Sequence, residues 1–177
     1  DFRNHSTCRF LEPLLACHDK GEEEVYGYAE LRREDAVTAR YRGYVEHWIP
    51  TRGLSDEALA ERIRADGIDI LVDLAGHTSG NRLGVFARKP APVSVSWLGY
   101  SYTTGLSAVD YLLTDEASAP PGSEGLFSER PWRLATPGYV FRPAEGMGEP
   151  GPLPAVARGH ITFGTLTRAV RVNHRTI

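Results

Sequence analysis

The sequence has few of the features that mark metal-binding or secreted proteins. Its 177 residues include two cysteines, Cys8 and Cys17, and neither forms a C-x-x-C pair or joins a cluster of histidines, so a zinc site is not indicated. On one helix the two would be separated by about 13 Å of rise. A disulfide allows roughly 7 Å between Cα atoms. We therefore expect free thiols, a reducing compartment and a cytoplasmic location.

Long apolar runs and a surplus of basic residues are absent as well. No run reaches the ~18 residues that a membrane-spanning helix needs. The formal net charge is −3 and the basic side chains are dispersed among acidic ones, so neither a membrane nor a nucleic acid is an expected partner. The chain has no initiator Met and no signal peptide. We expect it to be a fragment of a longer polypeptide.

Three signatures of nucleotide and diphosphate sites are also missing. The chain has no Gly-Lys-Ser/Thr phosphate loop and no G-x-G-x-x-G dinucleotide fingerprint. It has no D-x-D pattern either, so nothing in it suggests a metal that bridges a diphosphate. These absences argue against a P-loop NTPase and against a conventional NAD-binding domain.

What is present is an alternation of apolar, strand-like segments with amphipathic, helix-like ones. Ser55 is an expected helix N-cap and Gly67 an expected residue after a helix C-terminus. The nearly continuous apolar run from Ile68 to Leu74 is typical of a strand buried on both faces. The pattern predicts an α/β fold with a Rossmann-like parallel sheet and right-handed crossovers. We expect helices over 7–18, 35–44, 56–66 and 81–88, and strands over 24–29, 47–49, 68–74, 93–97, 109–114 and 131–134.

The end of the chain has a different composition. Residues 143–154, PAEGMGEPGPLP, are rich in proline and glycine and are typical of a linker. After them, His160–Gly164 has the pattern of a first strand in a new unit.

Three polar segments lie where chemistry is expected in such a fold. Ligands bind at the carboxyl ends of parallel strands, where backbone N–H groups and helix N-termini converge. DFRNHST at 1–7 precedes a helix and is either a phosphate-binding mouth or a capping segment with an incidental His. GHTSG at 76–80 is either a donor-rich ligand loop or a tight turn between strand and helix. WLGYSYTTG at 97–105 could hold a sugar or a peptide, or supply core aromatics and a turn.

Together these segments resemble the catalytic region of the O-GlcNAc transferase family, the SPINDLY-type glycosyltransferases linked to TPR repeats. The matching stretches are DFRNHST at 1–7, DGIDILVDLAGHTSGNRLGVFARKPAPVSVSWLGY at 66–100, TTGL and VDYLLTD within 103–115, FSERPWRL at 127–134 and ITFGTLTRAVRVN at 161–173. The long central stretch is far more specific than a single glycine loop.

The resemblance implies a GT-B architecture, in which two Rossmann-like lobes enclose the active site. Residues 1–142 would form the N-terminal catalytic lobe without its first strand, residues 143–158 the linker, and residues 159–177 the truncated start of the C-terminal lobe. The family transfers GlcNAc from UDP-GlcNAc to Ser or Thr hydroxyls of a protein or peptide acceptor, with inversion and without a required metal or other cofactor. Other expected partners are the missing C-terminal lobe and an upstream TPR region. The short linker lacks the large insert of animal members, which suggests a bacterial-type protein.

The resemblance also carries site residues onto this chain. Asp1 and His5 match the acid and the His near the sugar and the attacking hydroxyl, and either could be the general base. The expected substrate-binding residues are Thr7, His77, Thr78, Arg82, Leu98, Gly99, Tyr100, Thr103 and Thr104. The chain departs from the family at 99–103, where Tyr102 stands in place of a Gly. A side chain there adds bulk over the sugar and disfavours positive φ.

Two other functions remain open from the sequence. The chain could be a non-catalytic binding lobe, which Tyr102 and the truncation would explain. It could instead belong to another UDP-sugar enzyme of GT-B type, such as an epimerase. That class would need several carboxylates in the cleft, and only Asp1 and Asp73 are candidates.

Overall fold

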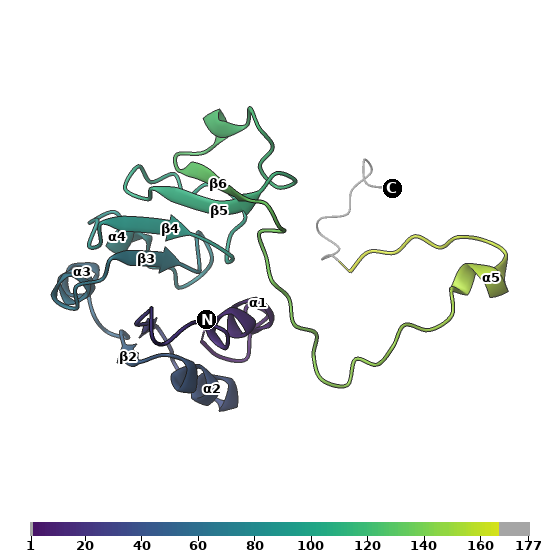
Figure 1. Cartoon of the computed structure of the whole chain (residues 1–177), viewed down its shortest axis with the longest axis horizontal. Helices are drawn as coiled ribbons and strands as arrows, with labels where there is room; N and C mark the ends of the chain where they lie inside the picture. The colour runs from purple at the N-terminus through teal and green to yellow at the C-terminus, as the bar shows by residue number, and fades with distance from the viewer. Residues whose placement is uncertain (1, 167–177) are drawn as a thin grey trace. The chain divides into compact units, whose positions relative to one another are not determined.

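The computed structural model describes residues 2–166, and the chain divides into two compact units, residues 1–143 and 144–177. As far as β4, the first unit alternates helices and strands as the sequence predicts (Figure 1). Its helices are α1 (Cys8–Leu15), α2 (Ala36–Tyr44), α3 (Asp56–Ala65) and α4 (Leu83–Phe86), with a 3₁₀ turn, η1, at Glu124–Leu126. Its strands are β1 (Tyr26–Ala29), β2 (His47–Pro50), β3 (Ile70–Asp73), β4 (Val93–Ser96), β5 (Tyr111–Asp115) and β6 (Arg130–Leu134).

Every strand pairing in the described residues is parallel. Strands β3, β4, β5 and β6 form one sheet in that order, and β1 pairs with β2 in a second sheet. The expected parallel α/β fold is therefore confirmed. β6 is an edge strand, which explains how it tolerates Pro131, a residue that cannot donate a ladder hydrogen bond.

The predicted ends of α3 are confirmed by its caps. The Ser55 side chain accepts a hydrogen bond from the Ala58 backbone N–H. Gly67 follows the helix with φ +71°, a left-handed conformation that glycine adopts without a Cβ penalty. At the start of α2, Asp35 and Thr38 bond reciprocally and form a capping box. These local contacts fix where the two helices begin and end.

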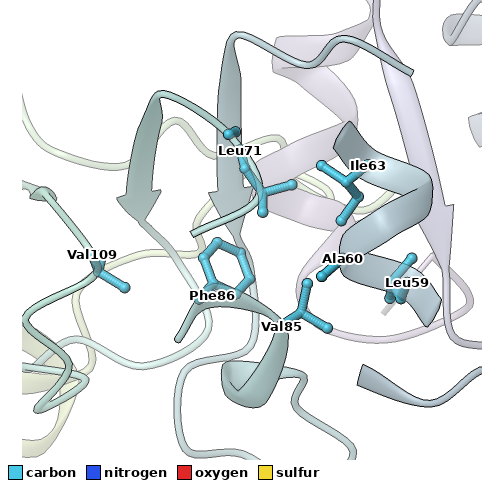
Figure 2. Packing of buried hydrophobic residues seen from close by; sticks show 8 residues of the cluster. Leu59, Ala60, Ile63, Leu71, Val85, Phe86 and Val109 are labelled. Carbon is cyan, nitrogen blue, oxygen red and sulfur yellow. The ribbon is translucent and has the colours of Figure 1, made fainter. Parts of the chain in front are cut away.

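One hydrophobic core lies between the four-stranded sheet and helices α3 and α4 (Figure 2). Leu59, Ala60 and Ile63 of α3 pack with Val85 and Phe86 of α4, and Figure 2 shows these side chains gathered between the two helices, with Leu71 of β3 beside them. Burial of a side chain of this size stabilises the fold by about 1.5–3 kcal/mol. Helix α4 has a single turn, so this packing must be what stabilises it.

A second core anchors the N-terminal helix. Cys8 and Leu11 of α1 pack with Tyr41 of α2 and with Trp97, which follows β4. This cluster joins α1 and α2 to the end of the four-stranded sheet. It brings residues near the start of the chain to the carboxyl end of β4.

Three details of the predicted elements are wrong. Helix α1 ends at Leu15 rather than at residue 18, and Cys17 lies beyond it, although both cysteines are free as expected. The helix predicted over 81–88 has only four residues. β3 is not buried on both faces, because Ile70 and Val72 are 60% and 44% exposed. Within the described residues, α3 and α4 cover only the face that carries Leu71.

The second unit contains α5 (Pro154–Arg158), a short helix inside the predicted linker. It ends at Gly159, whose φ is +71°. The strand expected at His160–Gly164 is wrong, since these residues have no strand pairing in the described structure. An apolar pattern becomes a strand only when a neighbouring strand satisfies its backbone groups. The family-like stretch at 161–173 continues past residue 166, and that part of it lies outside the described residues.

Candidate functional site

The segment that carries His5 is held against α2 by hydrogen bonds and aromatic packing. The Asn4 backbone N–H donates to the Asp35 carboxylate at 2.7 Å, and the Thr38 hydroxyl donates to the Phe2 carbonyl at 2.7 Å. The Phe2 ring also packs edge-on against Tyr41, with 5.2 Å between ring centroids. The same Asp35 that caps α2 therefore fixes the approach to α1.

The His5 ring is oriented by the next helix start. Its Nδ1 lies 2.6 Å from the Thr7 hydroxyl oxygen and accepts a hydrogen bond from the Thr7 backbone N–H at 3.3 Å. A nitrogen that accepts from an N–H carries no proton, so the neutral ring has its proton on Nε2. Partial burial, and to a lesser degree the charge of Arg3, lower the pKa of His5 below its ordinary 6.5. The ring is thus neutral at pH 7, with its basic lone pair on Nδ1.

The loop after β3 is shaped by a buried carboxylate. Asp73 accepts hydrogen bonds from the backbone N–H groups of Ala75 and Gly76 at 3.0 and 2.9 Å, and from the Ser96 hydroxyl at 3.2 Å. Burial raises the pKa of Asp73, and the three donors act in the opposite direction. A Cβ on Gly76 would lie 2.3 Å from the Tyr100 Cβ, so this loop touches the loop after β4.

The loop after β4 begins with a strained turn. Leu98 has φ +76°, and the Gly99 N–H donates to the Trp97 carbonyl at 3.0 Å, which is the hydrogen bond of a γ-turn. Positive φ is costly for a residue with a Cβ. Gly99 then passes so close to the loop after β3 that a Cβ there would lie 2.1 Å from the Leu74 carbonyl oxygen. Tyr102 has no positive φ, and its ring packs against Phe127 at 5.1 Å.

These segments surround a pocket of about 490 Å³ at the carboxyl ends of β3 and β4. Five of the predicted site residues line it, namely His5, Thr7, Thr78, Leu98 and Gly99. Six further residues line it that the sequence did not single out: Arg3, Ser6, Phe10, Ser79, Ser101 and Tyr139. The lining offers a cation, hydroxyl groups and aromatic faces, which suit a polar ligand that bears hydroxyls or negative charge.

Several predicted residues lie next to the pocket but do not line it. His77 donates from Nε2 to the Thr104 carbonyl at 2.9 Å, and its ring packs edge-on against Tyr100 at 5.3 Å. Thr103 and Thr104 direct their hydroxyls to the carboxylate of Glu129. Their predicted contacts with a substrate stay predictions, as does the role of Asp1, which lies outside the described residues.

Arg82 is engaged away from the pocket. Its Nε donates to Asp56 at 2.9 Å, its Nη1 to Glu30 at 2.8 Å and its Nη2 to the Leu54 carbonyl at 2.9 Å. The guanidinium therefore ties the start of α4 to the start of α3. Its predicted contact with a substrate stays a prediction.

Tyr139 lines the pocket although no pattern in the sequence marks it as a site residue. Its hydroxyl donates to the Ser101 hydroxyl at 3.1 Å, and the neighbouring Gly138 carbonyl accepts from Trp97 Nε1 at 2.8 Å. Both contacts join residues about forty positions apart, so no local pattern encodes them. Arg3, Ser79 and Ser101 could have been found, because they lie inside the polar segments already identified.

Two kinds of feature are absent from the described residues. Residues 2–166 contain no group of three or more His, Cys, Asp or Glu side chains that could hold a metal ion. Within the same part of the chain, no helix is long and apolar enough to cross a membrane.

Comparison with known proteins gives a consistent result. Residues 1–137 match the model of glycosyl transferase family 41. The probable UDP-N-acetylglucosamine–peptide N-acetylglucosaminyltransferases SPINDLY of Petunia hybrida and Arabidopsis thaliana are 34% and 36% identical to this chain over 181 residues. These alignments cover 100% of the chain but only 19% and 20% of the relatives. The chain thus spans about a fifth of the length of these curated relatives.

A solved structure is also similar. A mutant of the O-GlcNAc transferase of Thermobaculum terrenum superposes with a TM-score of 0.81 at 43% sequence identity. The superposition covers 86% of this chain and 29% of that one. At this level of identity the likeness extends beyond the bare fold.

Proposed function

The chain belongs to glycosyl transferase family 41, and from that premise we propose that it is the N-terminal catalytic lobe of a UDP-GlcNAc-dependent protein O-GlcNAc transferase. The reaction is the inverting transfer of GlcNAc to Ser or Thr hydroxyls of a protein or peptide. The observation that carries the proposal is the pocket at the carboxyl edge of the parallel sheet, which brings together His5, Thr7, Thr78, Leu98 and Gly99. The named activity of the similar proteins supports it.

In the proposed reaction the acceptor oxygen bonds to the anomeric carbon while the bond from that carbon to the diphosphate breaks. The acceptor hydroxyl loses its proton, and UDP leaves with the bonding electron pair. The protein then has two tasks, to hold the two substrates in line and to accept one proton. No metal enters the proposal, because the family does this chemistry without one.

We propose His5 as the group that takes the proton, with Asp1 as the other candidate. The lone pair of the neutral ring is on Nδ1, and that atom faces the Thr7 hydroxyl at 2.6 Å. A proton from the acceptor reaches Nδ1 through Thr7 Oγ1, which donates to the ring as it accepts from the substrate. The lowered pKa of His5 keeps the ring neutral and able to accept at pH 7.

The organisation of the whole protein is part of the proposal. We propose that residues 1–142 form the lobe, that 143–158 connect it to a second catalytic lobe beginning at 159, and that a TPR region lies upstream. In the described sheet β3 is an edge strand, which supports a further strand pairing beside it. The exposed apolar side chains of Ile70 and Val72 support an element that covers this face of the sheet. We also propose a bacterial-type protein, on the ground of its short linker, and a cytoplasmic location, which the free thiols of Cys8 and Cys17 support.

The test is a transfer assay with the full-length protein. Radiolabelled UDP-GlcNAc and a Ser/Thr-containing acceptor peptide are supplied, and both UDP release and labelled peptide are measured. UDP-glucose and UDP-GalNAc are run in parallel, and His5→Ala is the control for background hydrolysis. Labelled peptide with UDP-GlcNAc is the expected result. Epimerised UDP-sugar without peptide labelling, or no turnover by folded protein, would reject the proposal.

A further inference from the structure

Glu129 is a buried carboxylate to which the proposed reaction gives no part. It immediately precedes the edge strand β6 and is 3% exposed. Its oxygens accept hydrogen bonds from the Thr104 backbone N–H at 2.7 Å, the Thr103 hydroxyl at 2.8 Å and the Thr104 hydroxyl. All three donors belong to two consecutive residues at the end of the loop that follows β4.

These hydrogen bonds keep Glu129 charged. Burial by itself raises the pKa of this carboxyl, but the bonds from Thr104 and Thr103 outweigh burial and leave the pKa below its ordinary value. An ionised carboxylate accepts stronger hydrogen bonds than a neutral group does. The hydrogen bonds from Thr103 and Thr104 to Glu129 are therefore charge-assisted at neutral pH.

Through the two threonines, Glu129 is connected to both loops of the pocket, the one after β3 and the one after β4. The Thr104 carbonyl accepts the hydrogen bond from His77 Nε2, which joins the end of the loop after β4 to the loop after β3. At its beginning the same loop is fixed by the strained turn at Leu98 and by the close approach of Gly99 to Leu74. Leu98 and Gly99 at the first attachment line the pocket, and so does Ser101, which lies between the two attachments.

We infer that Glu129 is a positioning residue for the transfer reaction, whose carboxylate holds the loop of residues 98–105 in the shape that forms one wall of the pocket. This inference rests on the proposed function for its effect on catalysis. Glu129 does not line the pocket and acts through Thr103 and Thr104. Its chemistry suits the task because two fixed oxygens can hold three donors at once.

The test uses Glu129→Gln in the full-length protein. The side chain keeps its size, but it loses the charge and one of its oxygens becomes an NH₂ group that cannot accept from the threonines. A displaced wall misplaces the sugar against the acceptor, and we expect kcat to fall by about 10²-fold. The affinity for UDP, measured by calorimetry, should be unchanged, because in the GT-B arrangement that the resemblance implies the other lobe supplies most contacts with the nucleotide. A merely destabilising change would not separate these two quantities.

Matched variants control for charge and for folding. Glu124 lies, like Glu129, in the segment between β5 and β6, and its carboxylate pairs with Arg133 of β6 rather than with either loop of the pocket. Glu124→Gln should leave kcat unchanged. If Glu129→Gln does not fold, Thr103→Val removes the hydroxyl that donates to Glu129 and that also contacts Ser128 and the Gly105 N–H, while both bonds from Thr104 to Glu129 remain. Thr103→Ser restores the hydroxyl. We expect Thr103→Val to lower kcat and Thr103→Ser to rescue it.

Amide hydrogen exchange separates this inference from the proposed function. In Glu129→Gln we expect faster exchange at residues 98–105 and no change in β5. If the wild type transfers no GlcNAc but the loop still exchanges faster in the variant, the proposed function fails, and the structural part of the inference, that Glu129 holds residues 98–105 in shape, stands. Unchanged loop exchange together with wild-type kcat would overturn the inference.

Discussion

At the scale of single residues, the two histidines near the pocket have different surroundings. His5 lines the pocket and bonds through Nδ1 to Thr7, whereas His77 donates to a backbone carbonyl of the neighbouring loop. One is placed to meet a substrate and the other to hold a loop. Substitutions can separate these two tasks.

We expect His5→Ala to reduce activity more than His77→Ala does in the full-length enzyme. Loss of a group that acts on the transition state costs roughly 10²–10³-fold in rate, while loss of a loop contact should cost less. Neither ring is in the hydrophobic core, so neither change should create a cavity or lower stability much. Steady-state kinetics and thermal melts of both variants test this. Wild-type activity in a folded His5→Ala protein would remove His5 from the mechanism and leave Asp1 as the candidate base.

The lowered pKa of His5 predicts a pH dependence. The neutral ring is the active form, so activity should be lost as pH falls through a pKa that lies below 6.5. The positive charge of Arg3 contributes to that lowering, so Arg3→Gln should shift the acid limb of kcat/KM to higher pH. Arg33→Gln, at an exposed position, is the matched control. An acid limb that does not move in Arg3→Gln would contradict the assignment of this limb to His5.

At the scale of elements, two helix caps have the same chemistry and different neighbours. Asp35 caps α2 and also accepts from the Asn4 backbone N–H in the segment that carries His5. Ser55 caps α3, and its side chain accepts only from Ala58 in the described structure. A capping residue can therefore stabilise its own helix only, as Ser55 does, or it can also hold a segment of the functional site, as Asp35 does.

We expect Asp35→Ala and Ser55→Ala each to lower the free energy of unfolding by about 1 kcal/mol, because each removes an N-cap. Only Asp35→Ala should also lower activity, since it releases the approach to α1. Chemical denaturation gives the stability of the two variants and the transfer assay gives their activity. Equal activity at equal loss of stability would show that the Asn4 contact does not matter for the site.

At the scale of the whole molecule, the chain contains one wall of the proposed active site. Its pocket is lined by the N-terminal segment, by Phe10 of α1, by two loops of one sheet and by Tyr139. In the GT-B arrangement that the resemblance implies, the second lobe supplies most contacts with the nucleotide. The lobe described here would then position the sugar and the acceptor.

This division of substrate contacts between two lobes predicts how a polypeptide of residues 1–177 behaves by itself. We expect no sugar transfer and only weak binding of UDP by this polypeptide. Calorimetry with UDP and the peptide-labelling assay test both expectations, with the full-length protein as the positive control. Micromolar binding of UDP by the isolated chain would place the main nucleotide contacts in this lobe and contradict the division.

The sequence by itself determined the order and the class of most elements. Apolar periodicity, the cap at Ser55 and the glycine at position 67 act over a few residues, so their effects can be read locally. The same holds for the two polar segments that follow β3 and β4, because a loop that follows a parallel strand must lie at one edge of the sheet. Thr78 and Gly99 could therefore be expected together from the sequence. His5 precedes every described strand, and the packing of α1 brings it beside them.

Only the tertiary structure decided which side chains reach the pocket and which are used elsewhere. Tyr139 reaches the pocket, and Glu129 reaches the loop beside it, through contacts with residues 25 or more positions away. Arg82 is held away from the pocket by ion pairs with Asp56 and Glu30. The exposed face of β3 and the missing strand at 160–164 have the same origin. A side chain's partners, and a strand's neighbours, depend on how distant segments pack, and a local pattern of apolar and polar residues carries no record of that packing.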